Sequence, residues 1–442
     1  MKEIIETLYP MNRCLLGEGY DSAIEYIKHL VDLEVIEIPS GTKFGSWTVP
    51  DEWIVRDAWI KDPKGTKIAD YKKEPMRLVV GSAPIDTIIT LDELRKHWHY
   101  SDDLPDAIPY EFSYYQGEKS YWGFCFPKNE IRKPTAEIDP SIPVLKDGGI
   151  TLKTQDKLKK GKYHVLVDTE FAPGKMKIGV HTIKGKTDRE ILLFAHLDHP
   201  FQANDNLSGV ACLLDLASKI QKEYYDHTIK IVFCPETIGS VAYAYTQDLS
   251  KVDFMIAVEI CGNDGQLLLQ LPHDRDNRLS KVSHLALQGI GKSFKKGLFR
   301  NTIGSDEYVF NDPLINIPGI MLSRHPYKEY HTADDTPSVI NYDMITETGD
   351  VVLKIIEIWE RDYKPKRVFK GPLMRSRYDI QTKDKHTNLS WDYFIYAIDG
   401  KKYLSELCAD HGLNFSFAYE VLERIIEDGK ITRNPLSQVK KQ

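Results

Sequence analysis

Short apolar runs that alternate with helical patterns dominate the chain from about residue 150 onward. The runs that predict strands lie at 163–167, 177–181, 191–194, 228–234 and 254–260, and the patterns that predict helices lie at 210–221, 280–288 and 342–359. A run that is apolar at every position suits a strand buried on both faces. Strands that alternate with helices predict an α/β sheet covered by helices, with functional side chains at the strand ends.

The first third of the chain has a different pattern. Residues 1–38 predict helix, because apolar side chains recur at helical spacing between Tyr20 and Leu33. Residues 45–129 indicate a β-rich inserted domain, since aromatic or branched side chains alternate with polar ones from about Phe44 and further short strand patterns follow. The aromatic residues of this insert predict either a core of its own or a wall of a substrate pocket. They are Trp47, Trp53, Trp59, Trp98, Tyr114, Tyr115, Tyr121 and Trp122.

The C-terminal domain is expected at 366–442 and begins within a predicted linker at 364–367. Two short helical patterns, at 403–411 and 416–427, flank Gly412, and a strand pattern follows them. This order predicts a winged helix-turn-helix domain. The second helix carries three glutamates against one arginine, so a packing or dimerisation module is favoured over nucleic-acid binding. The catalytic domain is then expected at 1–44 and 130–365.

Composition narrows the setting of the protein. The net charge of -7 gives no general case for a nucleic-acid partner. The six cysteines are scattered without close pairing, which favours buried thiols in a reducing compartment. The charged N-terminus lacks the apolar core of a signal peptide, and no apolar run reaches the roughly 20 residues of a membrane span. We therefore expect a cytoplasmic protein without a membrane partner; oligomerisation with a second copy stays open.

Histidine and carboxylate residues follow the predicted strands. His196 and Asp198 come directly after the run 191–194, and Asp205 lies in the polar turn before the helix at 210–221. A histidine with a carboxylate beside it is a metal ligand with its orienting partner, and a helix N-terminus would help to keep Asp205 ionised. Further candidates at strand ends or in loops are Glu236, Glu259, Glu307 and His331. Such a mixed set suits a divalent metal of borderline softness, zinc first.

Several segments carry these residues in a fixed order along the chain. They are His196-Leu-Asp198, Asn204-Asp205-Asn206-Leu-Ser-Gly209, Glu236-Thr-Ile-Gly239, Glu259, Ser305-Asp306 and His331-Thr-Ala-Asp-Asp335-Thr. In this order they resemble the co-catalytic zinc aminopeptidase family, which also includes glutamate carboxypeptidase and glutaminyl cyclase. The resemblance covers about 1–40 and 130–365. It implies a zinc-aminopeptidase-like mixed sheet flanked by helices, in a bacterial branch that carries the insert and the C-terminal winged helix.

The resemblance also implies a role for each metal-site residue. His196 and Glu259 would bind the first metal ion, and Asp198 would orient His196. Asp205 would bridge two ions, and His331 would bind the second. The implied cofactor is zinc, as one or two ions.

Position 237 departs from the family pattern. The family has two adjacent glutamates here, the first a general base and the second a ligand of the second metal, whereas this chain has Glu236 followed by Thr237. Glu236 is then the expected base, and the second ion lacks a carboxylate. Three explanations stay open: the site holds one ion, Glu236 becomes a ligand, or Glu307 supplies the missing carboxylate.

The implied function is metal-assisted hydrolysis of an N-terminal peptide bond or a small amide, with Glu236 as the general base for the attacking water. One alternative is an amidohydrolase or deacylase that does not act on peptides. A second alternative is a ligand-sensing regulator built on a degenerate peptidase domain.

Overall fold

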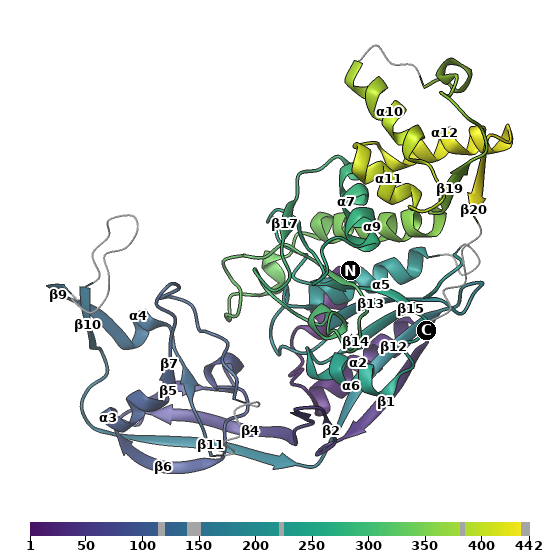
Figure 1. The fold of residues 1–442 in the computed structure, drawn as a ribbon. Coiled ribbons are helices and arrows are strands. Elements are labelled where there is room, and N and C mark those ends of the chain that lie inside the picture. The colour runs from purple at the N-terminus through teal and green to yellow at the C-terminus, as the bar shows by residue number, and fades with distance from the viewer. Residues whose placement is uncertain (114–119, 139–151, 221–224, 381–384, 435–442) are drawn as a thin grey trace.

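The computed structural model describes residues 1–113, 120–138, 152–220, 225–380 and 385–434 (Figure 1). Its main body contains an eight-stranded mixed sheet. Across the sheet the strands follow the order β1 (Leu33–Pro39), β12 (Lys175–Ile183), β14 (Thr228–Cys234), β13 (Glu190–His196), β15 (Val252–Val258), β18 (Gly319–Ser323), β16 (Leu268–Gln270) and β17 (Lys295–Gly297). The central strands β14, β13, β15 and β18 are parallel, and β1, β12 and β16 add antiparallel pairs. The predicted α/β fold class is confirmed.

Strand β13 explains why the run 191–194 is apolar at every position. Ile191 and Leu193 are buried in the core on one face of the sheet, and Leu192 and Phe194 in the core on the other. The first core is covered by α1 (Lys2–Leu8), α2 (Glu18–Leu30), α5 (Leu207–Lys219), α7 (Arg278–Ile290) and α9 (Tyr342–Arg361). The second core is covered by α6 (Ile238–Thr246) and α8 (Glu307–Phe310). Because β13, β14 and β15 are parallel, the residues that follow them gather at one edge of the sheet.

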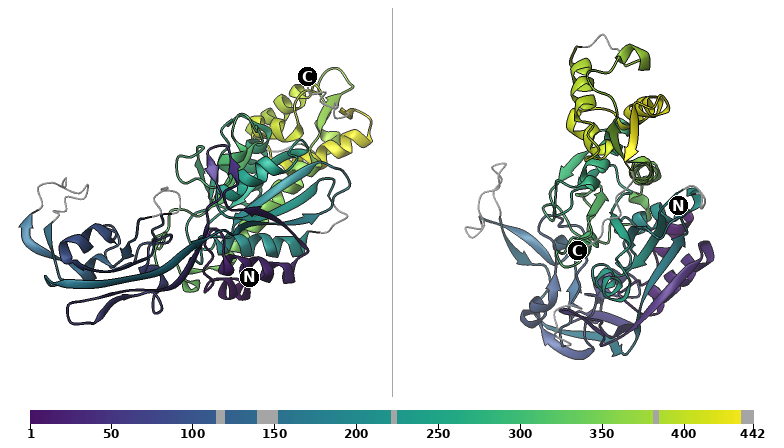
Figure 2. Two further views of the ribbon diagram at one scale, coloured as in Figure 1. Left: turned by 90° about the horizontal axis from the view of Figure 1, so that it is seen from below. Right: turned by 45° about the vertical axis from the view of Figure 1, so that its right-hand side comes forward.

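A second, antiparallel sheet projects from the main body (Figure 1, Figure 2). Its strands follow the order β5 (Lys67–Asp70), β4 (Glu52–Lys61), β11 (Lys162–Ala172) and β6 (Ile85–Thr90). Shorter elements of the same region are α3 (Leu91–Leu94), β7 (Trp98–His99), β8 (Phe124–Cys125), α4 (Lys128–Ile131), β9 (Arg132–Ile138) and β10 (Leu152–Asp156). We use the term insert core for the buried cluster of this region, which includes Trp53, Trp98, Tyr110 and Trp122. The short strands β2 (Lys43–Phe44) and β3 (Trp47–Thr48) instead pack against the main body.

The aromatic residues of the insert serve more than one purpose. Trp53, Trp98 and Trp122 belong to the insert core, as expected of a separate apolar centre. Trp59 instead meets His164 edge-on, and Trp47 packs against the core of the main sheet. Two further aromatic residues that the sequence analysis named, Tyr114 and Tyr115, lie outside the described residues.

One prediction about a helix, one about a strand and one about a linker were wrong. The helix expected over 1–38 is two helices followed by β1, whose branched side chains pair with β12. The strand at 163–167 was assigned to the main sheet, but β11 lies between β4 and β6 in the second sheet. The predicted linker at 364–367 is β19 (Lys364–Arg367), which pairs with β20 (Ile431–Asn434). In each case a partner distant in sequence decides the pairing.

The C-terminal helices α11 (Leu404–His411) and α12 (Phe415–Glu427) are present where the sequence predicted helix, and α10 (Lys385–Ala397) precedes them. Leu404 and Leu407 of α11 share one apolar core with α7 and α9. The exposed positions of α12 include Glu420, Arg424 and Glu427. The winged helix-turn-helix assignment stays a prediction. In the described residues, every helix is too short or too polar to cross a membrane.

Arg278 of α7 joins the main body to the C-terminal helices. Its guanidinium carbon lies 3.7 Å from the ring centre of Trp359 and 3.9 Å from that of Tyr403. Its Nε lies 2.9 Å from Oδ2 of Asp362, a carboxylate with no exposed side-chain surface. Asp362 also accepts hydrogen bonds from the backbone N–H and the hydroxyl of Ser405.

We expect Arg278→Met to lower the free energy of unfolding by about 3–5 kcal/mol, because it leaves the buried Asp362 carboxylate without its cation. Burial already raises the pKa of Asp362, and Arg278 opposes that rise. Urea denaturation followed by circular dichroism measures the change. Arg275→Met, at an exposed position three residues earlier, is the control and should change the free energy by less than about 0.5 kcal/mol. Equal stability of the two variants would contradict this prediction.

Candidate metal centre

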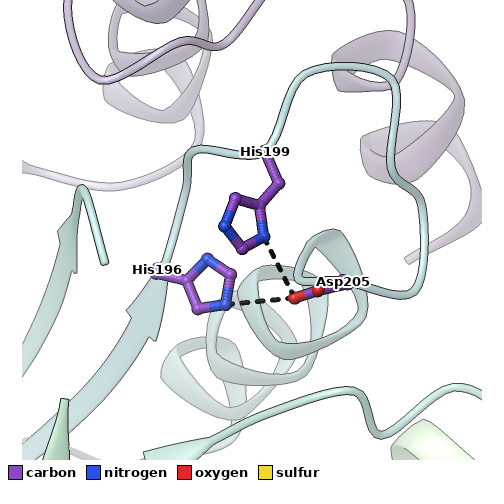
Figure 3. Close-up of side chains that lie close together, drawn as sticks. All are labelled: His196, His199 and Asp205. Atoms are coloured by element: carbon purple, nitrogen blue, oxygen red, sulfur yellow. Dashed lines mark ion pairs between the residues drawn. The ribbon is translucent and has the colours of Figure 1, made fainter. Parts of the chain in front are cut away.

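Two histidines and one aspartate converge where β13 ends. His196, His199 and Asp205 each offer a ligand atom, and these atoms lie within 4.8 Å of one another. Figure 3 shows both imidazoles directed toward Asp205. Oδ1 of Asp205 lies 3.2 Å from Nε2 of His196 and 3.3 Å from Nδ1 of His199. All three side chains are buried.

Two further predicted ligands complete this group. Nε2 of His331 lies 3.0 Å from Oδ2 of Asp205. Oε2 of Glu259, the residue after β15, lies 3.2 Å from Nε2 of His196. The two oxygens of Asp205 therefore face three imidazoles, and Glu259 faces the imidazole of His196.

The predicted orienting residue and the predicted base lie beside this group. Oδ1 of Asp198 lies 3.2 Å from Nδ1 of His196 and accepts a hydrogen bond of 2.8 Å from the backbone N–H of Glu236. Oε2 of Glu236 lies 3.5 Å from Nε2 of His199. The structure thus brings together six of the seven residues that the sequence analysis named as candidates, all but Glu307, although their roles stay predictions.

His199 is the residue that sequence reasoning missed. The signal is the histidine that directly follows His196-Leu-Asp198. After β13 ends, the backbone of His199 has a φ angle of +67°, which residues other than glycine rarely adopt. Thr237 and His331 also have positive φ, 61° and 52°. A positive φ angle at a residue other than glycine costs about 1–3 kcal/mol of conformational strain, and such residues are typical of functional sites.

The segment Asn204–Gly209 holds the loop after β15 through its polar side chains. The amide of Asn206 donates to the carbonyl of Val258 at 2.8 Å, and its oxygen accepts from the N–H of Ile260 at 3.0 Å. At Gly209, a Cβ atom would lie 2.2 Å from the carbonyl oxygen of Val258, so only glycine fits there. The peptide bond between Asp205 and Asn206 is cis. These contacts place Glu259, which lies between Val258 and Ile260, next to His196.

Arg13 holds the loop that carries His199. Its fully buried guanidinium donates to the carbonyls of Leu197 at 2.9 Å, His199 at 2.8 Å and Gln202 at 3.0 Å. Burial lowers the pKa of Arg13 to about 10, so the side chain stays charged at neutral pH. Nothing in the sequence near Arg13 pointed to this role.

The electrostatics of the centre favour positive charge. Burial by itself would lower the pKa of His196, but Glu259, Asp198 and Asp205 hold it well above its usual value. Burial would also lower the pKa of His199, but the neighbouring carboxylates, Asp205 first among them, raise it to about 10. Burial would raise the pKa of Asp205, yet the histidines lower it well below its usual value. Protonated imidazoles and a bound cation are two ways to satisfy these carboxylates.

Two ring nitrogens of the centre are placed as ligands of a metal ion would be. Nδ1 of His199 and Nε2 of His331 are buried, and neither makes a hydrogen bond to any residue in the described ranges. Each nevertheless lies within 3.3 Å of an Asp205 oxygen. Buried polar atoms normally have a hydrogen-bond partner. Nitrogen and oxygen atoms that face each other without hydrogen-bond geometry are placed as ligands of one cation would be, and this donor set suits zinc.

Glu307 lies behind the centre. Its carboxylate accepts hydrogen bonds from the side-chain amide of Gln270 at 2.9 Å and from the backbone N–H of Ser305 at 3.0 Å. Burial raises the pKa of Glu307 to about 7. Burial also raises the pKa of the neighbouring Asp306, to about 8. The hydroxyl of Ser305 donates to Glu259. Glu307 therefore supports the loop that contacts Glu259, and its own oxygens are taken by neutral donors.

The chain thus combines an aminopeptidase-like fold with a histidine–carboxylate centre at the strand ends. Residues 2–362 match the family described as Domain of unknown function (DUF4910), and the chain belongs to this family. A Clostridium acetobutylicum protein, provisionally described as a polysaccharide biosynthesis protein with an aminopeptidase-like domain, is 28% identical over 436 residues, which cover 96% of this chain and 94% of that protein.

Solved structures show the same fold. A crystal structure from Clostridium acetobutylicum, provisionally described as a peptidase, has a TM-score of 0.80 and 27% identity and covers 98% of this chain and 96% of that chain. BSAP, a zinc aminopeptidase from Bacillus subtilis, has a TM-score of 0.56 and 15% identity, with 80% of this chain and 94% of that chain covered. The predicted resemblance to zinc aminopeptidases is therefore confirmed for the fold.

Proposed function

We propose that this chain is a zinc-dependent hydrolase that cleaves an N-terminal residue from a peptide or hydrolyses a small amide. The observation that carries the proposal is the convergence of three imidazoles on the buried Asp205, with Glu259 beside His196 and Glu236 beside His199. The likeness of the fold to a zinc aminopeptidase supports it.

We assign two positions for zinc. His196, Glu259 and Asp205 would hold one ion, and Asp205 and His331 would hold the other. His199 faces the same oxygen of Asp205 as His196 does, and its other ring nitrogen lies beside Glu236, so we assign His199 to the second ion as a further ligand. His199 would then replace the carboxylate ligand that the chain lacks at position 237, where it has Thr237. Glu307 would not be needed as a ligand. Bound zinc lowers the pKa of a water molecule toward about 7 and polarises the substrate carbonyl.

The protein's own residues then orient groups and move protons. Asp198 contacts Nδ1 of His196 and holds the backbone of Glu236, so one carboxylate positions both a ligand and the base. The side chain of Glu236 is 27% exposed, whereas those of Asp205 and Glu259 are 2% exposed, so Glu236 can reach both water and substrate. Glu236 takes the proton of the attacking water and passes it to the leaving amine.

A groove beside α6 offers space for part of the substrate. Its volume is about 770 Å³, and its lining includes Thr237, Val241 and Tyr245 along α6, with Trp47 and Tyr308 opposite. Thr237 directly follows the expected base. A groove that is largely apolar and aromatic suits an apolar side chain or acyl chain that extends away from the reacting bond.

The test is hydrolysis by full-length protein that has been stripped with a chelator and reloaded with zinc. The panel contains aminoacyl anilides with a free amine and the matching N-acetylated compounds. We expect turnover of the free-amine series, loss of turnover after stripping, and recovery on addition of zinc. Absence of turnover across the panel at every zinc loading would contradict the proposal.

A deacylase is the second candidate, favoured by one observation. The 28% identical Clostridium acetobutylicum protein is provisionally described as a polysaccharide biosynthesis protein with an aminopeptidase-like domain. An N-acylated sugar would be a substrate that fits this description and the same hydrolytic site. The same panel, extended with N-acetylated amino sugars, decides between the two. Zinc-dependent release of acetate without release of anilide would favour the deacylase.

A further inference from the structure

We infer that the inserted domain forms part of the metal centre, and that Tyr110 is a positioning residue that holds His331 and His199 for the second metal ion. The part that concerns the ion rests on the proposed function. The part that concerns the two imidazoles rests on contacts alone.

The backbone of the insert pairs with the loop that carries His331. The N–H of Tyr110 donates to the carbonyl of His331 at 2.8 Å, and the N–H of Ala333 donates to the carbonyl of Ile108 at 2.9 Å. Between them, Pro109 and Thr332 form an antiparallel bridge. This register places the side chain of Tyr110 next to that of His331.

Aromatic contacts then set the orientation of His331. The ring of Tyr110 meets His331 edge-on, with ring centres 5.3 Å apart and planes at 82°. Tyr330 stacks on His331 at 3.9 Å and 17°. The ring of Tyr110 also lies 5.4 Å from that of His199. Since Tyr110 is 6% exposed, its ring is part of the packed interior between insert and centre.

The loop that carries His199 rests on the insert as well. Phe201 and Ala333, one in each histidine loop, pack against the insert core. The side-chain amide of Gln202 donates to the carbonyl of Thr332 at 3.0 Å and lies 4.0 Å from the sulfur of Met76 in the insert. The two loops are thus tied to each other and to the insert.

The first metal position has a different support. His196 ends β13 and Glu259 follows β15, so the main sheet carries both. A change in the insert should therefore affect the second position selectively. Most buried aromatic residues serve packing alone. If Tyr110 did so, its loss would weaken both metal positions alike.

The experiment compares full-length wild type with Tyr110→Ala, Tyr110→Leu and Tyr110→Phe. Tyr393→Ala is the matched control, because it makes the same chemical change at a 65% exposed position of α10. Zinc titration against a chromophoric chelator measures both binding steps. Mass spectrometry measures hydrogen–deuterium exchange at the imidazole C2 of His331 in the metal-free protein.

We expect Tyr110→Ala and Tyr110→Leu to weaken the second zinc-binding step by about 10- to 100-fold, as loss of a residue that orients a ligand does. The first step should stay unchanged, and imidazole exchange at His331 should change in the same two variants. Tyr110→Phe keeps the ring and should behave as wild type, as should Tyr393→Ala. Tyr110→Leu retains apolar volume, so it reports on orientation if Tyr110→Ala does not fold.

Unchanged zinc binding and unchanged His331 exchange in both Tyr110→Ala and Tyr110→Leu would overturn the inference. Equal weakening of both binding steps would overturn it too, since it would indicate a general loss of packing. If wild type binds no zinc, the proposed function fails, and the exchange measurement alone decides whether Tyr110 positions His331.

Discussion

Glu236→Gln is expected to lower kcat by roughly 10²- to 10⁴-fold, the usual contribution of a positioned general base. Glutamine keeps the shape of the side chain and its place beside His199, but it cannot accept a proton from water. The zinc content should stay at the wild-type value, because the ligand atoms that converge on Asp205 come from other residues. Steady-state kinetics and elemental analysis on the same sample measure both quantities.

A matched control separates this effect from a general change of charge. Glu420→Gln makes the same chemical change at an exposed position of α12 and should leave turnover intact. If Glu236→Gln also loses one zinc ion, Glu236 serves as a ligand, or as the partner that orients His199, and not mainly as the base. Full turnover in Glu236→Gln would exclude Glu236 as the base.

His196→Ala is expected to remove metal from the first position. The side chain is 1% exposed, and its Nε2 faces both Asp205 and Glu259. Without the imidazole, two buried carboxylates remain close together with one ligand fewer between them. The affinity for zinc should fall by more than the roughly 10- to 100-fold that loss of a ligand's partner causes. Elemental analysis after dialysis at fixed free zinc measures the loss.

His29→Ala is the control for this variant, because His29 lies exposed on α2. It should retain the wild-type ratio of zinc to protein. His199→Ala provides a comparison within the centre and should lose the second ion while the first remains. An unchanged ratio in His196→Ala would contradict the ligand set and with it the assignment of both positions.

Much of the site could be predicted because of where the strands end. His196 and Glu259 end or follow parallel strands β13 and β15, and Glu236 follows β14. Parallel strands have their carboxyl ends on the same edge, so apolar runs in the sequence indicate which polar residues meet. His331 was found differently, through the ordered resemblance to zinc aminopeptidases.

His199 and Tyr110 could not be predicted in the same way. His199 points toward Asp205 because its backbone has φ +67°, and local sequence patterns gave no sign of that conformation. Tyr110 reaches the centre through backbone hydrogen bonds to a loop more than 200 residues later in the chain. The aromatic residues named as a possible pocket wall did not include it.

The sequence alone determined the buried parallel strands, the helices that cover them and the set of histidines and carboxylates at the strand ends. These features depend on the local period of apolar side chains, which each segment carries by itself. Only the tertiary structure decided that β11 joins the second sheet, that Arg13 and the insert contact the histidine loops, and that His199 lies against Asp205. Those features depend on pairing between distant segments, whose energy appears only when the segments meet.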